Sequence, residues 1–190
     1  MVIPHGLSDP GRSGVDSERS NLIGFIGAGR FFPNRSAVDF IAGSVLAAPA
    51  LGALECRVIG QIEGYSTGHS RLAYMGFQTD LADALEEVSV VCAPMAESGG
   101  VSTKVLGALA CGKRTVCTPE AARGIARPPA GLWIAELGAF ARATLVALET
   151  PWSEEDSLAL RGAILRAHGS DAIAQAWEAL ISGRSETERQ

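Results

Sequence analysis

The fold is decided by the stretch Pro94-Met-Ala-Glu-Ser-Gly-Gly-Val-Ser-Thr-Lys104-Val-Leu-Gly-Ala-Leu-Ala-Cys-Gly112-Lys-Arg-Thr-Val-Cys-Thr118 and by the apolar run 88–93 before it. That run is rich in β-branched residues, which predicts a strand buried on both faces. Ser98 is the predicted N-cap of a helix whose apolar residues recur at helical spacing, and Gly112 is predicted to end that helix. The stretch therefore predicts a strand, a glycine turn, a helix and a second strand.

The glycine turn has the composition of an anion-binding site. Unpaired amides at the start of a helix carry a partial positive charge, which suits a phosphate. Gly99 and Gly100 allow the main chain to approach a ligand closely, and no acid between Glu97 and Glu120 complements the helix end near Lys104. The predicted site comprises Glu97, Ser98, Gly99, Gly100, Val101 and Lys104. The competing interpretation is a solvated lysine on an ordinary capped helix.

Composition excludes several classes of protein. With 190 residues and 47% hydrophobic content, the chain is long enough for one domain with a sizeable core. A net charge of -5 and the lack of a basic stripe argue against nucleic-acid binding. No apolar run has the length of a membrane span, and no signal peptide is predicted.

The cysteines and histidines indicate neither a metal site nor disulfides. The four cysteines have no Cys-x-x-Cys spacing, and the three histidines are scattered singly. The cysteines are interpreted as small core residues of a reduced, cytoplasmic protein.

Strands and helices alternate along most of the chain. Residues 1–20 are predicted to be a linker or flexible arm, 21–182 a Rossmann-like domain, and 183–190 a frayed tail. Predicted strands cover 21–27, 54–59, 72–76, 88–93, the residues after Gly112, and 132–134. Further helices are predicted from Asn34 or Ser36 to about 47, from Thr79 or Asp80 to 86, and over 136–148, 153–167 and 171–180. This alternation predicts an α/β fold, a doubly wound Rossmann-like parallel sheet of about six strands with helices on both faces.

Two glycine loops are expected to meet at one edge of this sheet. Ligands of such sheets bind at the carboxyl ends of the strands, where the strand order reverses. The loop after the first strand contains Gly29 and Arg30, and the loop after the fourth contains the predicted anion site. Both loops contain glycine and a cationic side chain, and main-chain amides and cations are the groups that bind a diphosphate.

Three segments together resemble a known family. They are Gly24-Phe-Ile-Gly-Ala-Gly-Arg30 with Pro33, Asn34 and Ala37, then Gly76-Phe-Gln-Thr-Asp80-Leu, and above all Pro94 to Thr118. They are similar to the carboxyl-terminal, nucleotide-sugar-binding domain of group 1 glycosyltransferases of the GT-B architecture. The opening Val2-Ile-Pro-His-Gly6 resembles that family's connection between its two domains.

The resemblance implies a function and a set of roles. The chain would be the donor-binding half of an enzyme that moves a sugar from a nucleoside-diphosphate sugar to an acceptor, with retention and without a cofactor or metal. Arg30 and Lys104 would place cations against the donor pyrophosphate, and Gly99 and Gly100 would offer amides. Arg35 is interpreted as an exposed residue at a helix start.

The chain departs from the family pattern in two respects. Gly107 stands where the family commonly has a glutamate that holds the ribose hydroxyls, and Gly99 stands at its partner acid. The amino-terminal acceptor domain is missing, so the chain is expected to be a truncated domain or to need a separate partner for activity. Its closing helices, which include Trp177 and Leu180, are expected to pack on that missing half or on their own sheet.

Two other functions remain open. Ile23 to Gly29 also resembles the opening of NAD(P)-dependent oxidoreductases, although Phe32 is bulky at the third fingerprint position and Gly60-Gln61, without an acid, closes the second strand. A non-catalytic nucleotide-binding or scaffolding module is favoured by Gly107 and by the missing domain. Titration with sugar nucleotides and nicotinamide dinucleotide distinguishes the three.

Overall fold

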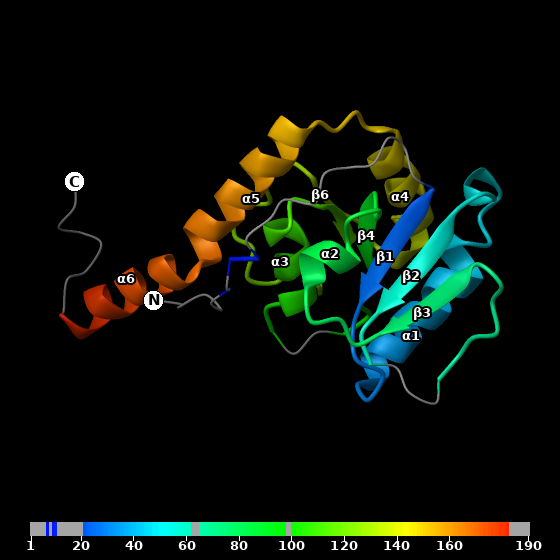
Figure 1. The fold of residues 1–190 in the computed structure, drawn as a ribbon, viewed down its shortest axis with the longest axis horizontal. Coiled ribbons are helices and arrows are strands. Elements are labelled where there is room, and N and C mark those ends of the chain that lie inside the picture. The colour runs from blue at the N-terminus through cyan, green and yellow to red at the C-terminus, as the bar shows by residue number, and fades with distance from the viewer. Residues whose placement is uncertain (1–6, 8, 11–20, 62–64, 98–99, 183–190) are drawn as a thin grey trace.

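Six parallel strands form a single twisted sheet (Figure 1). The computed structural model describes residues 7, 9–10, 21–61, 65–97 and 100–182. The strands are β1 (Leu22–Ile26), β2 (Glu55–Ile59), β3 (Leu72–Gly76), β4 (Val90–Ala93), β5 (Arg114–Cys117) and β6 (Leu132–Ile134). Their order is β3-β2-β1-β4-β5-β6. The order therefore reverses between β1 and β4, as the predicted fold class requires.

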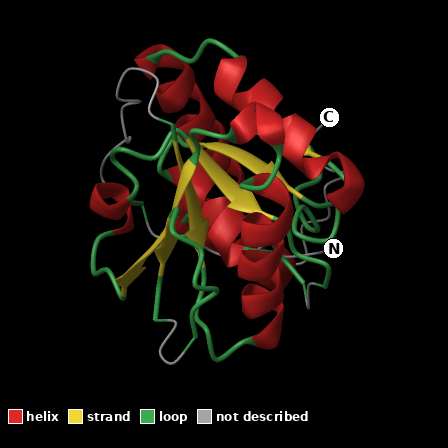
Figure 2. Cartoon of the chain, turned by 90° about the vertical axis from the view of Figure 1, so that its right-hand side faces the viewer, coloured by secondary structure: helices red, strands yellow, loops and turns green. Residues whose placement is uncertain are grey.

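Helices cover both faces of the sheet (Figure 2). They are α1 (Phe32–Phe40), α2 (Leu81–Ala84), α3 (Thr103–Ala110), α4 (Phe140–Glu149), α5 (Glu154–His168) and α6 (Ser170–Ile181). A π-helix, η1 (Ile41–Val45), continues α1, and the short 3-10 turns η2 (Pro49–Leu51) and η3 (Leu137–Ala139) complete the described elements. At the end opposite β3, α5 and α6 run away from the sheet one after the other (Figure 1).

The alternation of residues along β1 shows how the two layers form. Ile23 and Phe25 belong to the large hydrophobic cluster that includes residues of α1 and α4. Gly24 lies between them and faces the turn that follows α2, where a Cβ atom would come within 3.1 Å of Val88 Cγ1. Since successive side chains point to opposite faces, one central strand serves both layers. A glycine at position 24 lets the second layer approach closely.

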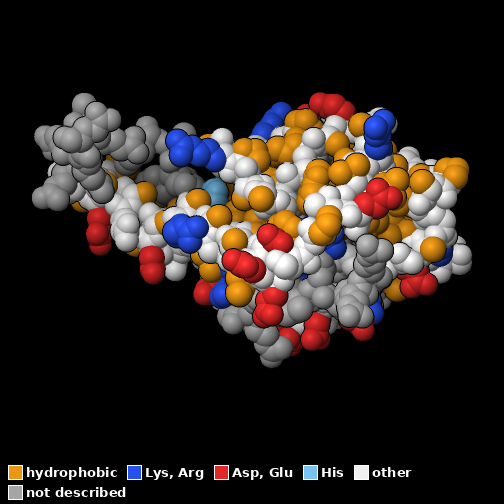
Figure 3. Space-filling model, turned by 90° about the horizontal axis from the view of Figure 1, so that it is seen from above, with side chains coloured by type: hydrophobic (Ala, Val, Ile, Leu, Met, Phe, Trp, Pro, Cys, Tyr) orange, Lys and Arg blue, Asp and Glu red, His pale blue; other side chains and the backbone are white. Residues whose placement is uncertain are grey.

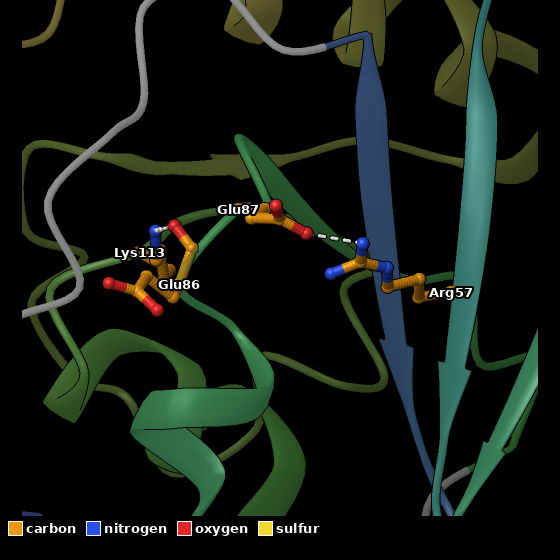
Figure 4. Close-up of polar contacts among 4 residues, drawn as sticks. All are labelled: Arg57, Glu86, Glu87 and Lys113. Carbon is orange, nitrogen blue, oxygen red and sulfur yellow. Dashed lines mark hydrogen bonds and ion pairs between the residues drawn. The ribbon is translucent and has the colours of Figure 1, made fainter.

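Two cations hold the turn between α2 and β4 (Figure 4). Arg57 of β2 forms an ion pair with Glu87. Lys113, which is only 1% exposed, donates from Nζ to the backbone oxygen of Glu86 over 3.0 Å. These contacts tie the turn before β4 to β2 and to the residue before β5.

The structure corrects several predicted helix starts. α1 begins at Phe32, with Pro33 in its first turn and no side-chain cap, so Asn34 and Ser36 are not its cap. α3 begins at Thr103, and Ser102 occupies its N-cap position. Ser98, the predicted cap, lies outside the described residues. The prediction of Asp80 as the cap of α2 is confirmed, because its side chain accepts from the amides of Ala82 and Asp83, although α2 ends earlier than expected.

The end of α3 follows the sequence prediction, whereas the end of α1 does not. Gly112 has φ +72° directly after α3, the left-handed conformation expected of a helix stop. The helix predicted to continue to about residue 47 changes at Ile41 into η1, where the amide of Leu46 donates to the oxygen of Ile41 over 2.9 Å. Ile41, Val45 and Leu46 are fully buried or nearly so, and the wider turn directs all three into the core.

The described residues form neither a basic stripe on the face shown in Figure 3 nor a helix suited to cross a membrane, as the composition predicts. On the face seen from above in Figure 3, the described Lys and Arg side chains are scattered and do not form a stripe. Within the described ranges, no helix has both the length and the apolar character needed to cross a membrane.

Candidate functional site

The loops after β1 and β4 leave the same edge of the sheet side by side. β1 pairs with β4 in parallel, with Ile23 opposite Val90 and Gly24 opposite Val91. Lys104, in the first turn of α3, reaches across this junction and donates from Nζ to Asn34 Oδ1 over 2.6 Å. The two loops predicted to converge are therefore connected at the point where the strand order reverses.

Lys104 is a partly buried cation, and its contacts among the described residues are with neutral groups. Its Nζ lies 3.3 Å from Met95 Sδ and 5.6 Å from the centre of the Phe25 ring. Burial lowers the pKa of Lys104 from 10.5 to about 8, because desolvation disfavours the charged form. The amine is still mostly protonated at neutral pH, and an anion nearby would stabilise it.

The helices that start at this junction lack the first-turn acids that α2, α5 and α6 carry, which α4 also lacks. α1 and α3 have no acidic residue in their first turns and no side-chain cap. By contrast, Asp80 caps α2, and α5 begins with a Ser153–Asp156 capping box and has three acids in its first turn, Asp156 among them. Because a helix start carries partial positive charge, α1 and α3 leave this charge uncompensated by the protein at the same edge of the sheet.

The loop after β1 is fastened to the end of β2. The amide of Gly27 donates to the oxygen of Ile59 over 2.9 Å, and that of Gly29 donates to the oxygen of Gln61 over 2.8 Å. Gly60 has φ +131°, and a Cβ atom there would lie 2.2 Å from the oxygen of Gly27. The conformation of the loop therefore requires a glycine at position 60, because a side chain there would collide with the backbone of Gly27.

Arg35 contacts the glycine loop, whereas the sequence interpretation makes it an exposed residue at a helix start. It is half-buried, and its Nε donates to the oxygen of Gly29 over 2.6 Å. Its guanidinium lies 5.5 Å from the centre of the Tyr65 ring, and the Tyr65 hydroxyl bonds to Asp39. Burial raises the pKa of Tyr65. Arg35 therefore holds the glycine loop; a signal for it was its position one helical turn after that loop.

The predicted site residues fall into three groups. Gly29 is buried and Lys104 half-buried. Asn34 connects Lys104 to the residue before Gly29, because its Oδ1 accepts from Lys104 Nζ and its Nδ2 donates to the oxygen of Ala28 over 2.8 Å. Arg30 is exposed and, within the described ranges, has no hydrogen-bond or ion-pair partner, so no contact joins it to Lys104.

The remaining predicted residues lie in the loop before α3. Glu97 and Gly100 are exposed, and Gly100 has φ +154°. Val101 is half-buried and packs on the backbone of Gly124, where a Cβ atom would lie 2.4 Å from its Cγ2. Ser98 and Gly99 lie outside the described residues.

A hollow of about 370 Å³ lies along another face of α3. Gly107 opens onto it, and a Cβ atom at this position would lie 3.2 Å from Leu81 Cδ2. The helix glycine is therefore closely packed against Leu81. The hollow is lined by Leu7, Asp9, Pro10, Thr79, Asp80, Leu81, Thr103, Gly107, Ala110 and Cys111.

The cysteines are buried in the core. All four are free thiols. Burial raises the pKa of Cys92, Cys111 and Cys117 to about 12 and that of Cys56 well above its usual value. The described part of the chain contains no group of three His, Cys, Asp or Glu side chains arranged to hold a metal ion.

Comparison with known proteins gives one family. Residues 20–150 match the model of a family described as glycosyl transferases, group 1. No curated protein matches the chain.

Solved glycosyltransferases share the fold at low sequence identity. A glycosyltransferase from Rickettsia africae is 13% identical, with a TM-score of 0.69 over 97% of this chain and 58% of its own. HepE from Anabaena, solved with UDP and glucose, is 12% identical, with a TM-score of 0.65 over 86% of this chain and 48% of its own. The lipopolysaccharide outer core galactosyltransferase WaaB is 13% identical, with a TM-score of 0.65 over 97% of this chain and 56% of its own. The chain thus spans about half the length of these proteins.

Proposed function

This chain belongs to the group 1 glycosyl transferases, and on that premise we propose that it is the half of such an enzyme that binds the sugar nucleotide. It holds a nucleoside-diphosphate sugar for transfer to an acceptor that binds elsewhere. The observation that carries this proposal is the position of Lys104, which crosses from the start of α3 to Asn34 at the start of α1. A cation between two uncapped helix starts has the chemistry of a diphosphate site.

Two arginines, Arg30 from the loop after β1 and Arg35 from the first turn of α1, complete the proposed diphosphate site. Arg35 reaches the loop through its Nε bond to Gly29, which leaves its two terminal nitrogens for other partners. Arg30 is exposed and lies in the loop itself. Charge on a departing nucleoside diphosphate grows as the sugar leaves, so fixed cations and amides stabilise the transition state more than the bound donor. The proposed transfer proceeds with retention and without a metal ion.

The hollow beside α3 is proposed to take the nucleoside. It opens on the same helix that carries Lys104, with Thr103 and Gly107 on its wall. Asp9 and Asp80 also line it, and carboxylates accept hydrogen bonds from ribose hydroxyls. Gly107 offers no side chain for that purpose, so the acids of the neighbouring segments are proposed to act instead. The Anabaena HepE structure with UDP-glucose supports a uridine nucleotide as the first ligand to test.

The acceptor is proposed to bind on a second half that this chain does not include. The chain spans about half the length of HepE and the Rickettsia protein. α6 packs mainly against α5, and none of its described side chains is buried. Trp177, Leu180 and Ile181 are 49%, 47% and 82% exposed. This apolar surface supports a partner half at the end of the molecule where α6 lies.

Replacement of Arg35 with alanine tests the diphosphate site. We expect the affinity for UDP to fall by about 10-fold, because one charged contact to phosphate is lost and the Gly29 loop loses a hydrogen bond. Calorimetric titration with UDP and UDP-glucose measures the change. Arg166→Ala, which removes an exposed cation from the last turn of α5, is the matched control and should leave the affinity unchanged. Binding of nicotinamide dinucleotide in place of UDP, or of neither, would reject the proposed function.

The affinity for UDP should also depend on pH through Lys104. The pKa of this amine is lowered to about 8, so the ammonium is present below that value and is lost as the pH rises through it. Since the charged form binds the diphosphate, affinity is expected to be highest at neutral pH and to decline above pH 8. Titrations from pH 7 to pH 9 measure the decline, and an affinity that stays constant over this range would remove Lys104 from the site.

A further inference from the structure

We infer that Asn34 is a positioning residue that joins the ammonium of Lys104 to the glycine loop after β1, so that both loops bind a diphosphate as one unit. The inference rests on the proposed function and adds to it a residue that touches no ligand. The inference follows from the side-chain amide of Asn34, whose oxygen bonds to Lys104 at the start of α3 and whose nitrogen bonds to Ala28 in the loop after β1.

Both polar atoms of the Asn34 amide are used within the site. Oδ1 accepts from Lys104 Nζ over 2.6 Å, and Nδ2 donates to the oxygen of Ala28 over 2.8 Å. The side chain is 4% exposed, so water does not substitute for either partner at low cost. Asn34 belongs to α1 and Lys104 to α3, and 70 positions separate them in the chain. The amide is therefore a bridge between two distant segments.

The backbone makes room for this bridge. A Cβ atom on Gly27 would lie 2.8 Å from Asn34 Cγ and 2.9 Å from its Nδ2. The missing side chain at position 27 thus admits the amide beneath the loop. With Pro33 in the first turn of α1, the helix starts in a defined orientation and directs Asn34 to this place.

The bridge has a specific effect on the cation. An ammonium has three N–H donors; one bonds to Asn34 and one to Met95 Sδ, which leaves a third for a ligand. Within the part of the chain that the structure describes, the groups in contact with Nζ are the Asn34 amide, the Met95 thioether and the Phe25 ring, and all three are neutral. A neutral acceptor orients the ammonium without neutralising it, which is what an anion site requires.

The test compares Asn34→Ala, Asn34→Asp and the control Ser36→Ala, which removes a half-buried hydroxyl from the same helix. Asn34→Ala should weaken UDP binding by about 10-fold, because the cation loses its fixed position. Asn34→Asp keeps the shape but places a carboxylate beside the ammonium. It should weaken UDP binding further and shift its decline with pH above 8, because an adjacent carboxylate favours the protonated amine. Ser36→Ala should match the unaltered protein.

A second measurement separates this inference from the proposed function. Lys104 and Lys113 are the two lysines of the chain, so nuclear magnetic resonance can follow the Lys104 side chain in ligand-free protein, with Lys113→Met as the assignment aid. A raised Lys104 pKa in Asn34→Asp supports the bridge even if UDP does not bind, an outcome that would reject only the proposed function. An unchanged Lys104 pKa in Asn34→Asp, or UDP affinity unchanged in Asn34→Ala, would overturn the role of Asn34.

Discussion

Lys104→Met is expected to weaken UDP binding by about 100-fold, because the cation at the junction of the two loops is removed. Methionine has a similar length and suits the neighbouring Phe25 ring and Met95 thioether. The variant should remain folded with a similar thermal midpoint. The variant loses the hydrogen bond to Asn34, which lowers the free energy of unfolding, but it also no longer has to desolvate a charge, and the two effects offset each other. The Lys104 substitution therefore separates binding from stability.

The chain offers a matched control in Lys113→Met. Lys113 is the more buried of the two lysines, and its Nζ bonds to the backbone oxygen of Glu86 in the turn before β4. This substitution should lower the thermal midpoint and leave the UDP affinity of the folded protein unchanged. Thermal unfolding and calorimetric titration of both variants give the comparison. Equal losses of affinity in the two variants would mean that Lys104 acts through stability alone.

Gly60→Ala is expected to destabilise the protein more than any other substitution discussed for the site. The backbone at Gly60 has φ +131°, and a Cβ atom would lie 2.2 Å from the oxygen of Gly27. Since both atoms belong to or adjoin the backbone, either β2 or the glycine loop must move. We expect a loss of about 3 kcal/mol or more, which combines backbone strain with the broken anchoring of the loop. UDP binding should fail with it, because Gly27 and Gly29 bond to the end of β2.

Gly68→Ala controls for backbone strain alone. Gly68 also has positive φ, +70°, but no atom lies within 4 Å of the Cβ position. It should cost only about 1 kcal/mol, with UDP binding intact. Urea unfolding of both variants measures the difference. If the two glycines cost the same, the close approach between Gly60 and Gly27 does not constrain the loop.

The central strand β1 was predictable because a buried parallel strand needs a continuous apolar run. The edge strands β3 and β6, in which no residue is buried, were predictable from short apolar segments bounded by turn residues. Leu22–Ile26 and Leu132–Ile134 were located to within a residue, and so was Leu72–Gly76. The alternation with helices then left few possible topologies. Helix starts were less predictable. Asn is a residue type that is preferred at helix N-caps, yet the side-chain amide of Asn34 bonds to Lys104 and Ala28 instead. A local pattern does not reveal a bond between residues 70 positions apart.

Only the part of the candidate site that forms a local sequence motif could be predicted. The glycines and Lys104 were visible as a local motif. Arg35 was not, because its contact with Gly29 depends on how α1 leaves the loop. The π-helix at Ile41–Val45 also escaped prediction, since its residues have ordinary helical composition and only their packing favours the wider turn.

The burial of Cys56, Cys92, Cys111 and Cys117 has a practical consequence for such experiments. Thiols react with maleimides as thiolates, and these four are shielded from reagent and poorly ionised. A cysteine introduced on the exposed face of α6, for instance at Ile181, would be labelled selectively with a fluorophore. Such a labelled chain would report by fluorescence anisotropy when a second polypeptide covers that helix.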